Sequence, residues 1–226
     1  MFKDGDHIIK PAYSNENVLI QISNMVLVSK KTRITVPIRY KAIAIIDDKP
    51  LFRIESCKEK LFVKAYGKEY INKELKIAFI ISKTFAQSAW GFGNIQVNNE
   101  RLKEAYRIGA NGRYTIEIVD YAKLIQAFPG TQEIDMEQVR ERIISTLKTV
   151  GTPILSDYFS NTNTSVFEMN SLISDFREKF LMALQEEKIF VNMGIKIATI
   201  TVNNFHTNEE DLEIIRKRIN SGGEET

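Results

Sequence analysis

The stretch "AYRIGANGRYTIEIVD", residues 105–120, decides the fold of this chain. Apolar and small residues occupy its even positions, which are Tyr106, Ile108, Ala110, Gly112, Tyr114, Ile116 and Ile118. Arginine, asparagine, threonine and glutamate fall between them, together with one further glycine. A period of two is typical of a strand that buries one face.

Asn111-Gly112 raises two alternatives to that strand. The dipeptide is common in hairpin turns, but a two-residue hairpin would place Ala110 opposite Arg113. The apolar residues of the two arms would then lie on opposite faces. A phosphate-binding loop would need the spacing G-x-x-x-x-G-K-S/T, which is absent. We predict one continuous strand from Ala105 to Val119, with the glycines forming a bulge or bend.

The composition is that of an ordinary soluble globular protein, with 226 residues, 43% hydrophobic and 27% charged. This length allows one large domain or two small ones. A net charge of +2 is too small to indicate nucleic acid or an anionic membrane as a partner. The single cysteine, Cys57, excludes an intramolecular disulfide and fits a reducing compartment.

We expect neither a signal peptide nor a membrane-spanning helix. The N-terminus lacks a charged stretch followed by an apolar one. The longest apolar runs, such as Ile77–Ile81, have the length of a strand, whereas a span needs about 20 residues. If the protein acts at a membrane, we expect another component to hold it there.

The first hundred residues predict strands and turns. Between Ile34 and Ile46 every even position is apolar, but Pro37 cannot donate a ladder hydrogen bond. We therefore expect this strand to lie at an edge or to break at Pro37. Asp47-Asp48-Lys49-Pro50 predicts a turn directly after it.

Helical spacing replaces the alternation after Asp120. "YAKLIQAF" predicts a short helix that ends at Pro129-Gly130. Asp135 and Gln138 form the spacing of a capping box, and the helix behind them is expected to stop at Gly151 and Pro153.

A second helix is predicted behind Ser165 and Glu168, which have the spacing of another capping box. Its apolar stripe is interpreted as core packing and consists of Met169, Leu172, Ile173, Phe176, Phe180 and Leu184. "GIKIATITV" then predicts a strand, "TNEEDLEIIRKRIN" a third helix and "SGGEET" a disordered tail.

This order predicts an α+β fold. The predicted parts are a β-rich subdomain over residues 1–97, an α/β subdomain of strand-helix-helix-strand order over 98–205, and an exit helix with a disordered tail over 206–226.

No constellation of residues predicts catalysis. The histidines, His7 and His206, belong to no metal-binding motif. Cys57 lies beside Lys58, and we interpret it as a thiol without a functional role. Asp47-Asp48 fits a turn, and the acids Glu209–Asp211 fit a helix N-terminus. We therefore predict no catalytic, cofactor-binding or metal-binding residue.

Two short stretches keep a functional alternative. "WGFGN", Trp90–Asn94, fits a packed corner, but it could also form the wall of a ligand pocket. Arg216–Arg218 fits a solvated helix end better than a nucleic-acid patch.

The stretch "WGFGNIQVNNERLKEAYRIGANGRYTIEIVDYAKLIQAFPGTQ" resembles the stomatin/prohibitin/flotillin (SPFH, band-7) superfamily, in its virion-core-protein-like bacterial branch. The residues that carry the resemblance are Trp90, Gly91, Asn98, Gly112, Tyr114, Ile118, Asp120 and Gly130. "NMGIKIATITV" is similar to the closing strand of that family, and the helix after it to the helix that leaves the domain. Two features depart from the family, because Tyr121 stands where a proline is usual and "NIQVNN" lacks prolines.

The resemblance implies a non-enzymatic scaffold that forms homo-oligomers and takes part in membrane organisation or membrane-stress complexes. It implies no cofactor and no nucleic acid. With no N-terminal anchor in the sequence, we expect a cytoplasmic protein, peripheral at the inner face of the membrane and held there by partner proteins. The alternative is an α+β enzyme or a small-ligand-binding domain with a pocket near Trp90.

Overall fold

The computed structural model describes residues 7–12, 18–81 and 85–221. It is an α+β structure, so the predicted fold class is confirmed. Strands dominate the N-terminal part and helices gather toward the C-terminus. Ser221, the first residue of the predicted disordered tail, ends the last helix, and the rest of that tail lies outside the described residues.

Contacts group the chain into two compact units. Unit 1 holds Met1–Thr84 and Asp120–Val139, and unit 2 holds Phe85–Val119 and Arg140–Thr226. The subdomain boundaries expected after residues 97 and 205 differ from the bounds of these two compact units. The expected boundaries stay a prediction.

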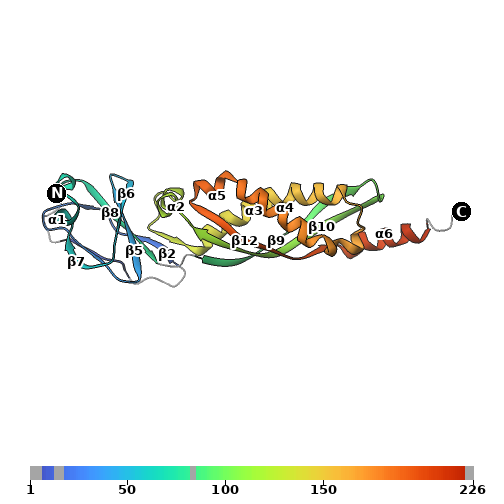
Figure 1. Ribbon diagram of the computed structural model, residues 1–226, viewed down its shortest axis with the longest axis horizontal. Helices are drawn as coiled ribbons and strands as arrows, with labels where there is room; N and C mark the ends of the chain where they lie inside the picture. The colour runs from blue at the N-terminus through green and yellow to red at the C-terminus, as the bar shows by residue number, and fades with distance from the viewer. Residues whose placement is uncertain (1–6, 13–17, 82–84, 222–226) are drawn as a thin grey trace. The chain divides into compact units, whose positions relative to one another are not determined.

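Unit 1 is built mainly from short strands (Figure 1). These are β1 (Ile8–Ile9), β2 (Val18–Ile22), β3 (Val26–Leu27), β4 (Arg33–Val36), β5 (Tyr40–Ile46), β6 (Lys49–Ile54), β7 (Cys57–Leu61), β8 (Glu74–Ile81) and β11 (Glu133–Asp135). The larger sheet has the order β11-β2-β8-β5-β6, with β3 paired to β8, and the smaller has the order β1-β4-β7. The helices of the unit are α1 (Phe62–Tyr66), the 3₁₀-helix η1 (Lys68–Tyr70) and α2 (Tyr121–Ala127).

Strand β5 is buried on both faces. Its even residues join a core cluster with residues of β4, β8 and α1, including Ile34, Ile77 and Phe62. Ile43 and Ile45, on the other face of β5, are also about 95% buried, with 5% exposed. The alternation in the sequence indicated only the first of these two faces.

The predicted breaks in this part of the chain are confirmed. β4 ends at Val36, directly before Pro37, and β5 begins at Tyr40. Asp47 and Asp48 form the turn between β5 and β6 with positive φ angles of 50° and 62°. Two such residues in a row are typical of a type I′ hairpin turn. Lys49 and Pro50, which were also predicted to lie in the turn, are instead the first residues of β6.

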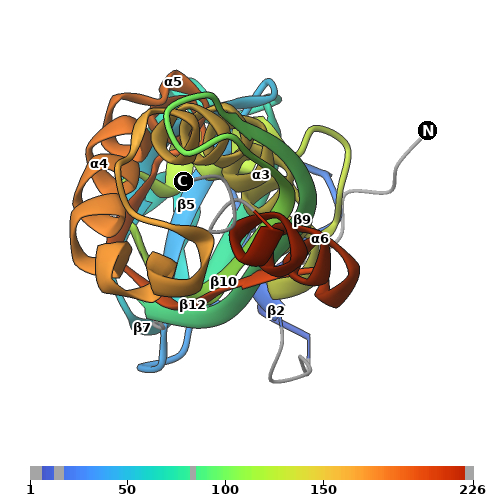
Figure 2. The same ribbon diagram turned by 90° about the vertical axis from the view of Figure 1, so that its right-hand side faces the viewer.

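Unit 2 is a three-stranded antiparallel sheet with helices along one face (Figures 1 and 2). The strand order is β12-β10-β9, where β9 is Phe85–Asn99, β10 is Glu104–Ile118 and β12 is Ile195–Thr207. Figure 2 shows the sheet curving around α3 and α4. The helices are α3 (Met136–Asn161), η2 (Val166–Leu172), α4 (Ile173–Glu186), α5 (Lys188–Asn192) and α6 (Glu209–Ser221).

Strand β10 is the continuous strand predicted from the alternating stretch. Its even residues all face the core: Tyr106, Ile108, Tyr114, Ile116 and Ile118 are between 0% and 7% exposed. Thr115 lies on the other face and is only half-buried. No turn occurs at Asn111-Gly112, which excludes the hairpin.

Three irregularities occur in the sheet, and two of them lie opposite Gly109 and Gly112. In each case the extra residue belongs to the neighbouring strand, so the glycines do not form a bulge in β10, and the alternative of a bend stays a prediction. Between Ile108 and Ala110 the strand β9 contains one extra residue, at Gly93-Asn94, where Asn94 has a φ of 59°. Strand β12 contains extra residues at Ala198 and Asn203. Each extra residue shifts the alternation by one, so that the neighbouring strands keep their apolar side chains on the core face. "WGFGN" is therefore a bulged part of a strand and not a corner.

Helix α3 does not stop at Gly151 and Pro153, as the sequence had predicted, but continues to Asn161. Pro153 lies on the exposed side of the helix, where water can satisfy the backbone carbonyl that loses its partner. Leu155 and Phe159 continue the buried stripe, and both are 0% exposed. Gly151 does not end the helix but allows it to pack closely on β9, because a Cβ at this position would lie 2.6 Å from the Phe92 ring.

The first predicted capping box forms and the second does not. Asp135 and Gln138 exchange hydrogen bonds of 3.1 and 2.8 Å between side chain and backbone. The Ser165 hydroxyl instead donates to Glu104 of β10, at 2.8 Å, and makes no cap bond to its own helix. That helix begins as the 3₁₀-helix η2, and the predicted apolar stripe behind it packs in the core, with Phe176 and Phe180 at 0% exposure.

We expect Ile116→Ala to lower the free energy of unfolding by about 2–5 kcal/mol, the range of a core deletion. Ile116 is 1% exposed on the face of β10 that the helices cover. Thr115→Ala, one residue away on the opposite face, should cost much less. Urea unfolding of both variants measures the difference, and similar losses would contradict the single buried face.

Candidate functional site

Two of the residues that carry the family resemblance, Trp90 and Gly112, lie together where β9, β10 and β12 pair. The indole N–H of Trp90 donates to the carbonyl oxygen of Thr201, across the strand between them, at 3.1 Å. Gly112 lies under this bond, and a Cβ there would be 1.8 Å from the same oxygen. The Trp90 ring is 4% exposed and packs against Phe92 and Phe180 at centroid distances of 5.1 and 5.5 Å. These contacts hold the three strands together and pack the sheet against α4.

Asp120 begins helix α2. Its carboxylate accepts hydrogen bonds from the backbone N–H groups of Ala122 and Lys123, at 2.9 and 3.2 Å. Tyr121 occupies the first helical position, where a proline is favoured because no partner for the N–H is needed there. Tyrosine fits this position because its ring is buried, and that burial raises the pKa of the Tyr121 hydroxyl. The departure from the family pattern thus leaves the cap intact.

Two buried polar side chains on neighbouring strands escaped the sequence analysis. Asn99 donates to the carbonyl oxygens of Phe159 and Thr162, at 3.0 and 2.8 Å, and so caps the end of α3. Glu104 accepts from the Ser165 hydroxyl and the Val166 N–H. Each partner lies about sixty residues away in the chain, so no local motif indicates the pairing. Asn98, the residue of the resemblance, is exposed.

Helix α6 is attached to the sheet by an ion pair. The Asp211 carboxylate accepts from the backbone N–H of Arg107 at 2.8 Å and from two guanidinium nitrogens at 3.0 and 2.9 Å. The hydrogen bonds from the Arg107 side chain lower the pKa of Asp211, against the opposing effect of burial. The sequence had explained the acids at this helix start by the helix dipole alone, which misses the role of Asp211.

The other candidate residues are scattered. His206 is exposed, and its ring lies over Gly109, where a Cβ would be 2.3 Å from Nε2. His7 belongs to unit 1 and is half-buried. Cys57 is half-buried with Sγ 3.8 Å from the Ile34 carbonyl oxygen.

Acidic residues gather into no metal site in the described part of the chain, where no group of three His, Cys, Asp or Glu could hold an ion. Asp47 and Asp48 instead pair with Lys73 and Lys76 at 2.9 and 2.7 Å. The prediction that the chain has no catalytic, cofactor-binding or metal-binding residue stays a prediction.

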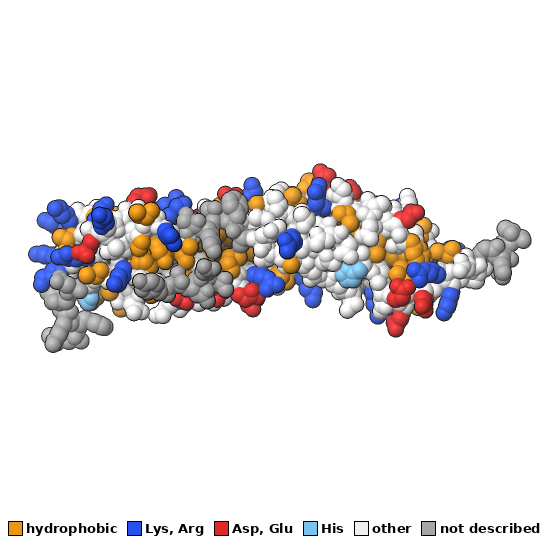
Figure 3. Space-filling model, turned by 90° about the horizontal axis from the view of Figure 1, so that it is seen from below, with side chains coloured by type: hydrophobic (Ala, Val, Ile, Leu, Met, Phe, Trp, Pro, Cys, Tyr) orange, Lys and Arg blue, Asp and Glu red, His pale blue; other side chains and the backbone are white. Residues whose placement is uncertain are grey.

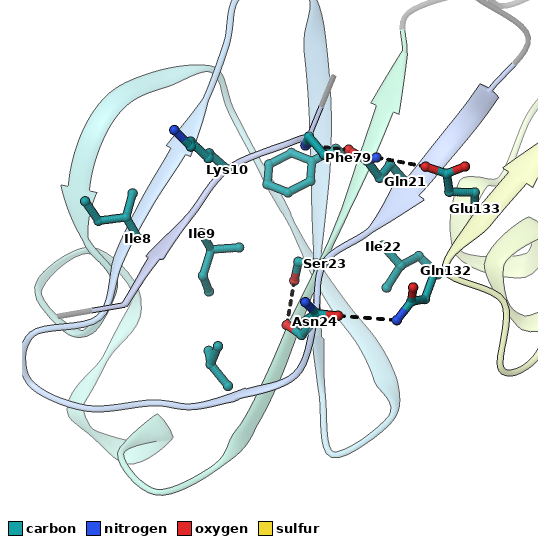
Figure 4. Close-up of a pocket in the computed structure, with 12 residues that line it drawn as sticks. Ile8, Ile9, Lys10, Gln21, Ile22, Ser23, Asn24, Phe79, Gln132 and Glu133 are labelled. Atoms are coloured by element: carbon teal, nitrogen blue, oxygen red, sulfur yellow. Dashed lines mark hydrogen bonds between the residues drawn. The ribbon is translucent and has the colours of Figure 1, made fainter. Parts of the chain in front are cut away.

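A pocket of about 600 Å³ opens in unit 1 beside the edge of the larger sheet (Figure 4). Four of the polar side chains that line it form hydrogen bonds: Gln21, Asn24, Gln132 and Glu133. The buried amide of Gln21 accepts from the Ala12 N–H at 2.7 Å and donates to Glu133 at 3.0 Å, and Gln132 donates to Asn24 at 3.3 Å. A ligand that used these four side chains would have to displace the bonds between them.

Comparison with protein families decides the assignment. The SPFH domain-Band 7 family model matches residues 65–222, more than two thirds of the chain. The chain belongs to this family. A comparison with curated proteins gives no significant match. Among the described residues of this SPFH domain, no helix combines the length and apolarity that a membrane crossing requires.

We expect Gly112→Ala to destabilise the SPFH domain by about 3 kcal/mol or more, at the upper end of overpacking costs. The obstacle is the backbone carbonyl of Thr201, which has no rotamer to move to. Gly91→Ala, in the neighbouring strand, is the matched control, because its nearest atom would be 3.5 Å away. Thermal unfolding compares the two, and equal losses would show that the close approach is not needed.

We expect Asp211→Asn to cost about 1–2 kcal/mol at neutral pH, because it weakens charge-assisted hydrogen bonds whose Arg107 partner is half exposed. Since the folded-state pKa of Asp211 is lowered, its contribution is present above the unfolded value of about 3.9 and is lost as pH falls through the folded value. The difference from the unmodified protein should therefore shrink as the pH falls below about 3.9 and vanish once the pH is below the folded-state pKa. Glu210→Gln, whose carboxylate is 81% exposed, is the control and should have little effect in the same urea titrations.

Proposed function

We propose that this SPFH domain is a non-enzymatic scaffold that assembles with copies of itself and takes part in membrane-organising or membrane-stress complexes through partner proteins. Membership of the family supports the scaffold class. The virion-core-protein-like branch and a location at the inner face of the membrane belong to the same proposal.

The observation that carries self-assembly is the apolar stripe of α6. Ile215 is 2% exposed, packed within unit 2, and Ile219 follows four residues later on the same side of the helix. Ile219 is nevertheless 56% exposed. It lies one turn beyond Ile215, on a part of α6 that the rest of the described chain leaves open to solvent. Ile214, on another side of the helix, is 54% exposed.

The surroundings of this stripe suit a protein partner. Phe167 of η2 is 43% exposed, and the guanidinium of Arg216 lies 5.4 Å from its ring centroid. Figure 3 shows hydrophobic side chains gathered among acidic and basic ones over this end of unit 2. An apolar centre with a charged rim is the usual anatomy of a protein–protein interface. A second copy of the chain carries an identical stripe. In a symmetric contact the stripe of each copy therefore covers the stripe of the other.

The ligand-binding alternative has no comparable observation in its favour. Trp90 is buried and its N–H is engaged with Thr201. The pocket of about 600 Å³ lies in unit 1, and Trp90 does not line it.

We expect the purified chain to run as an oligomer in size-exclusion chromatography with light scattering, and Ile219→Glu to shift it toward the monomer. A carboxylate at the centre of an apolar contact is left without a partner, and a shift of roughly tenfold or more in the dissociation constant follows from its desolvation. Met182→Glu is the matched control, because Met182 is 59% exposed on α4. A monomeric chain, or an equal effect of the two substitutions, would overturn self-assembly through α6.

A further inference from the structure

The net charge of +2 is the sum of two opposed parts. Residues 1–84 contain sixteen lysines and arginines against nine acids, a net charge of +7. The remaining residues contain fifteen against twenty, a net charge of −5. A membrane headgroup senses charges within a Debye length of about 8 Å at physiological salt, so the local charge matters and not the sum.

Basic side chains gather at one end of unit 1. Lys30 and Lys31 lie in the turn before β4, and Lys64 lies on α1. The backbone N–H of Phe62 donates to the carbonyl oxygen of Thr32 at 2.8 Å, which brings that turn and the start of α1 together. We call this group, with the neighbouring exposed Lys60 and Lys68, the basic end: Lys30, Lys31, Lys60, Lys64 and Lys68. Figure 3 shows Lys and Arg side chains crowded at the end of unit 1 where Figure 1 places α1.

Few acids oppose the basic end. Glu59 is already paired with Arg33, at 2.5 Å. Glu69 is exposed, with its carboxylate beside the backbone of Gly67. All five lysines of the basic end are exposed, so their ammonium groups can reach a partner.

Exposed aliphatic side chains accompany the lysines. In the smaller sheet Arg33 is the register partner of Ile8 on one side and of Leu61 on the other. Directly opposed residues point to the same face, so the three side chains form a row. Ile8 is 52% and Leu61 is 38% exposed. A surface that combines ammonium groups with protruding aliphatic side chains suits the boundary between headgroups and acyl chains.

We propose that the basic end of unit 1 binds the headgroups of anionic phospholipids directly. The inference rests on the proposed function, for which it supplies a membrane contact made by the chain itself besides the one made through partners. An anionic bilayer fits better than single-stranded nucleic acid, because the exposed apolar side chains here are aliphatic, whereas single strands are bound by stacking on aromatic rings.

The test is sedimentation of the full chain with phosphatidylcholine vesicles, with and without phosphatidylglycerol. We expect binding only to the vesicles that contain phosphatidylglycerol, and its loss at high salt. The triple variant Lys30→Glu, Lys31→Glu, Lys64→Glu should lower the partition coefficient between vesicles and solution by roughly tenfold or more. The matched control is Lys148→Glu, Lys188→Glu, Lys196→Glu, which makes the same change of net charge with exposed lysines of unit 2 and should bind as the unmodified chain does.

The outcomes separate this inference from self-assembly. No binding to anionic vesicles, or an equal loss in both triple variants, overturns it. Binding to single-stranded DNA with no binding to anionic vesicles overturns it in favour of a nucleic-acid surface. Light scattering on the same samples reports the oligomer, so a monomer that still binds vesicles through the basic end would remove the proposed self-assembly and leave the lipid contact standing. Unchanged circular dichroism melts show that the variants are folded.

Discussion

The close approach of β10 to β12 at Gly112 is the constraint on which the rest of unit 2 depends. The Thr201 carbonyl oxygen occupies the space where any other residue at position 112 would place its Cβ. The same oxygen accepts the indole N–H of Trp90, so one backbone group ties three strands together. The sheet can then curve around α3 and α4 and keep a single apolar face against them (Figure 2). The glycine matters here for the space it leaves, because its φ is that of an ordinary strand residue.

The period-two pattern of the sequence was sufficient to predict a strand whose buried and exposed residues alternate along its whole length. Tyr106 to Ile118 alternate without interruption, so β10 could be predicted from its sequence. Strand β12 was predicted only in its first half, because the extra residue at Asn203 reverses the alternation and makes "NNFHT" look polar although Phe205 is 2% exposed. Propensity rules misplaced the end of α3, since they treat Pro153 as a stop whichever side of the helix it is on. Asn99, Glu104 and Asp211 could not be predicted, because their partners are distant in the chain.

Several polar side chains of this SPFH domain form hydrogen bonds that hold its own helices in place. Asp120 and Asn99 cap helices, Glu104 receives the start of η2, and Asp211 fastens α6. Motif residues that might have suggested chemistry thus have structural partners. Two exposed surfaces of the described chain are of another kind: the exposed turn of the α6 stripe and the basic end of unit 1. Both are suited to contact with large partners, and such contact is what a scaffold has to provide.

The connection from β12 to α6 has a mechanical consequence. Only Asn208 separates the end of the strand from the start of the helix, so a pull on α6 passes directly into β12. β12 is held to β10 by an antiparallel ladder whose register extends over eleven residues of β10, from Ile108 to Ile118. Tension along the strand would load these backbone hydrogen bonds together, in shear, and would not open them one after another as peeling does. Unit 2 is therefore built to resist force that reaches it through its last helix.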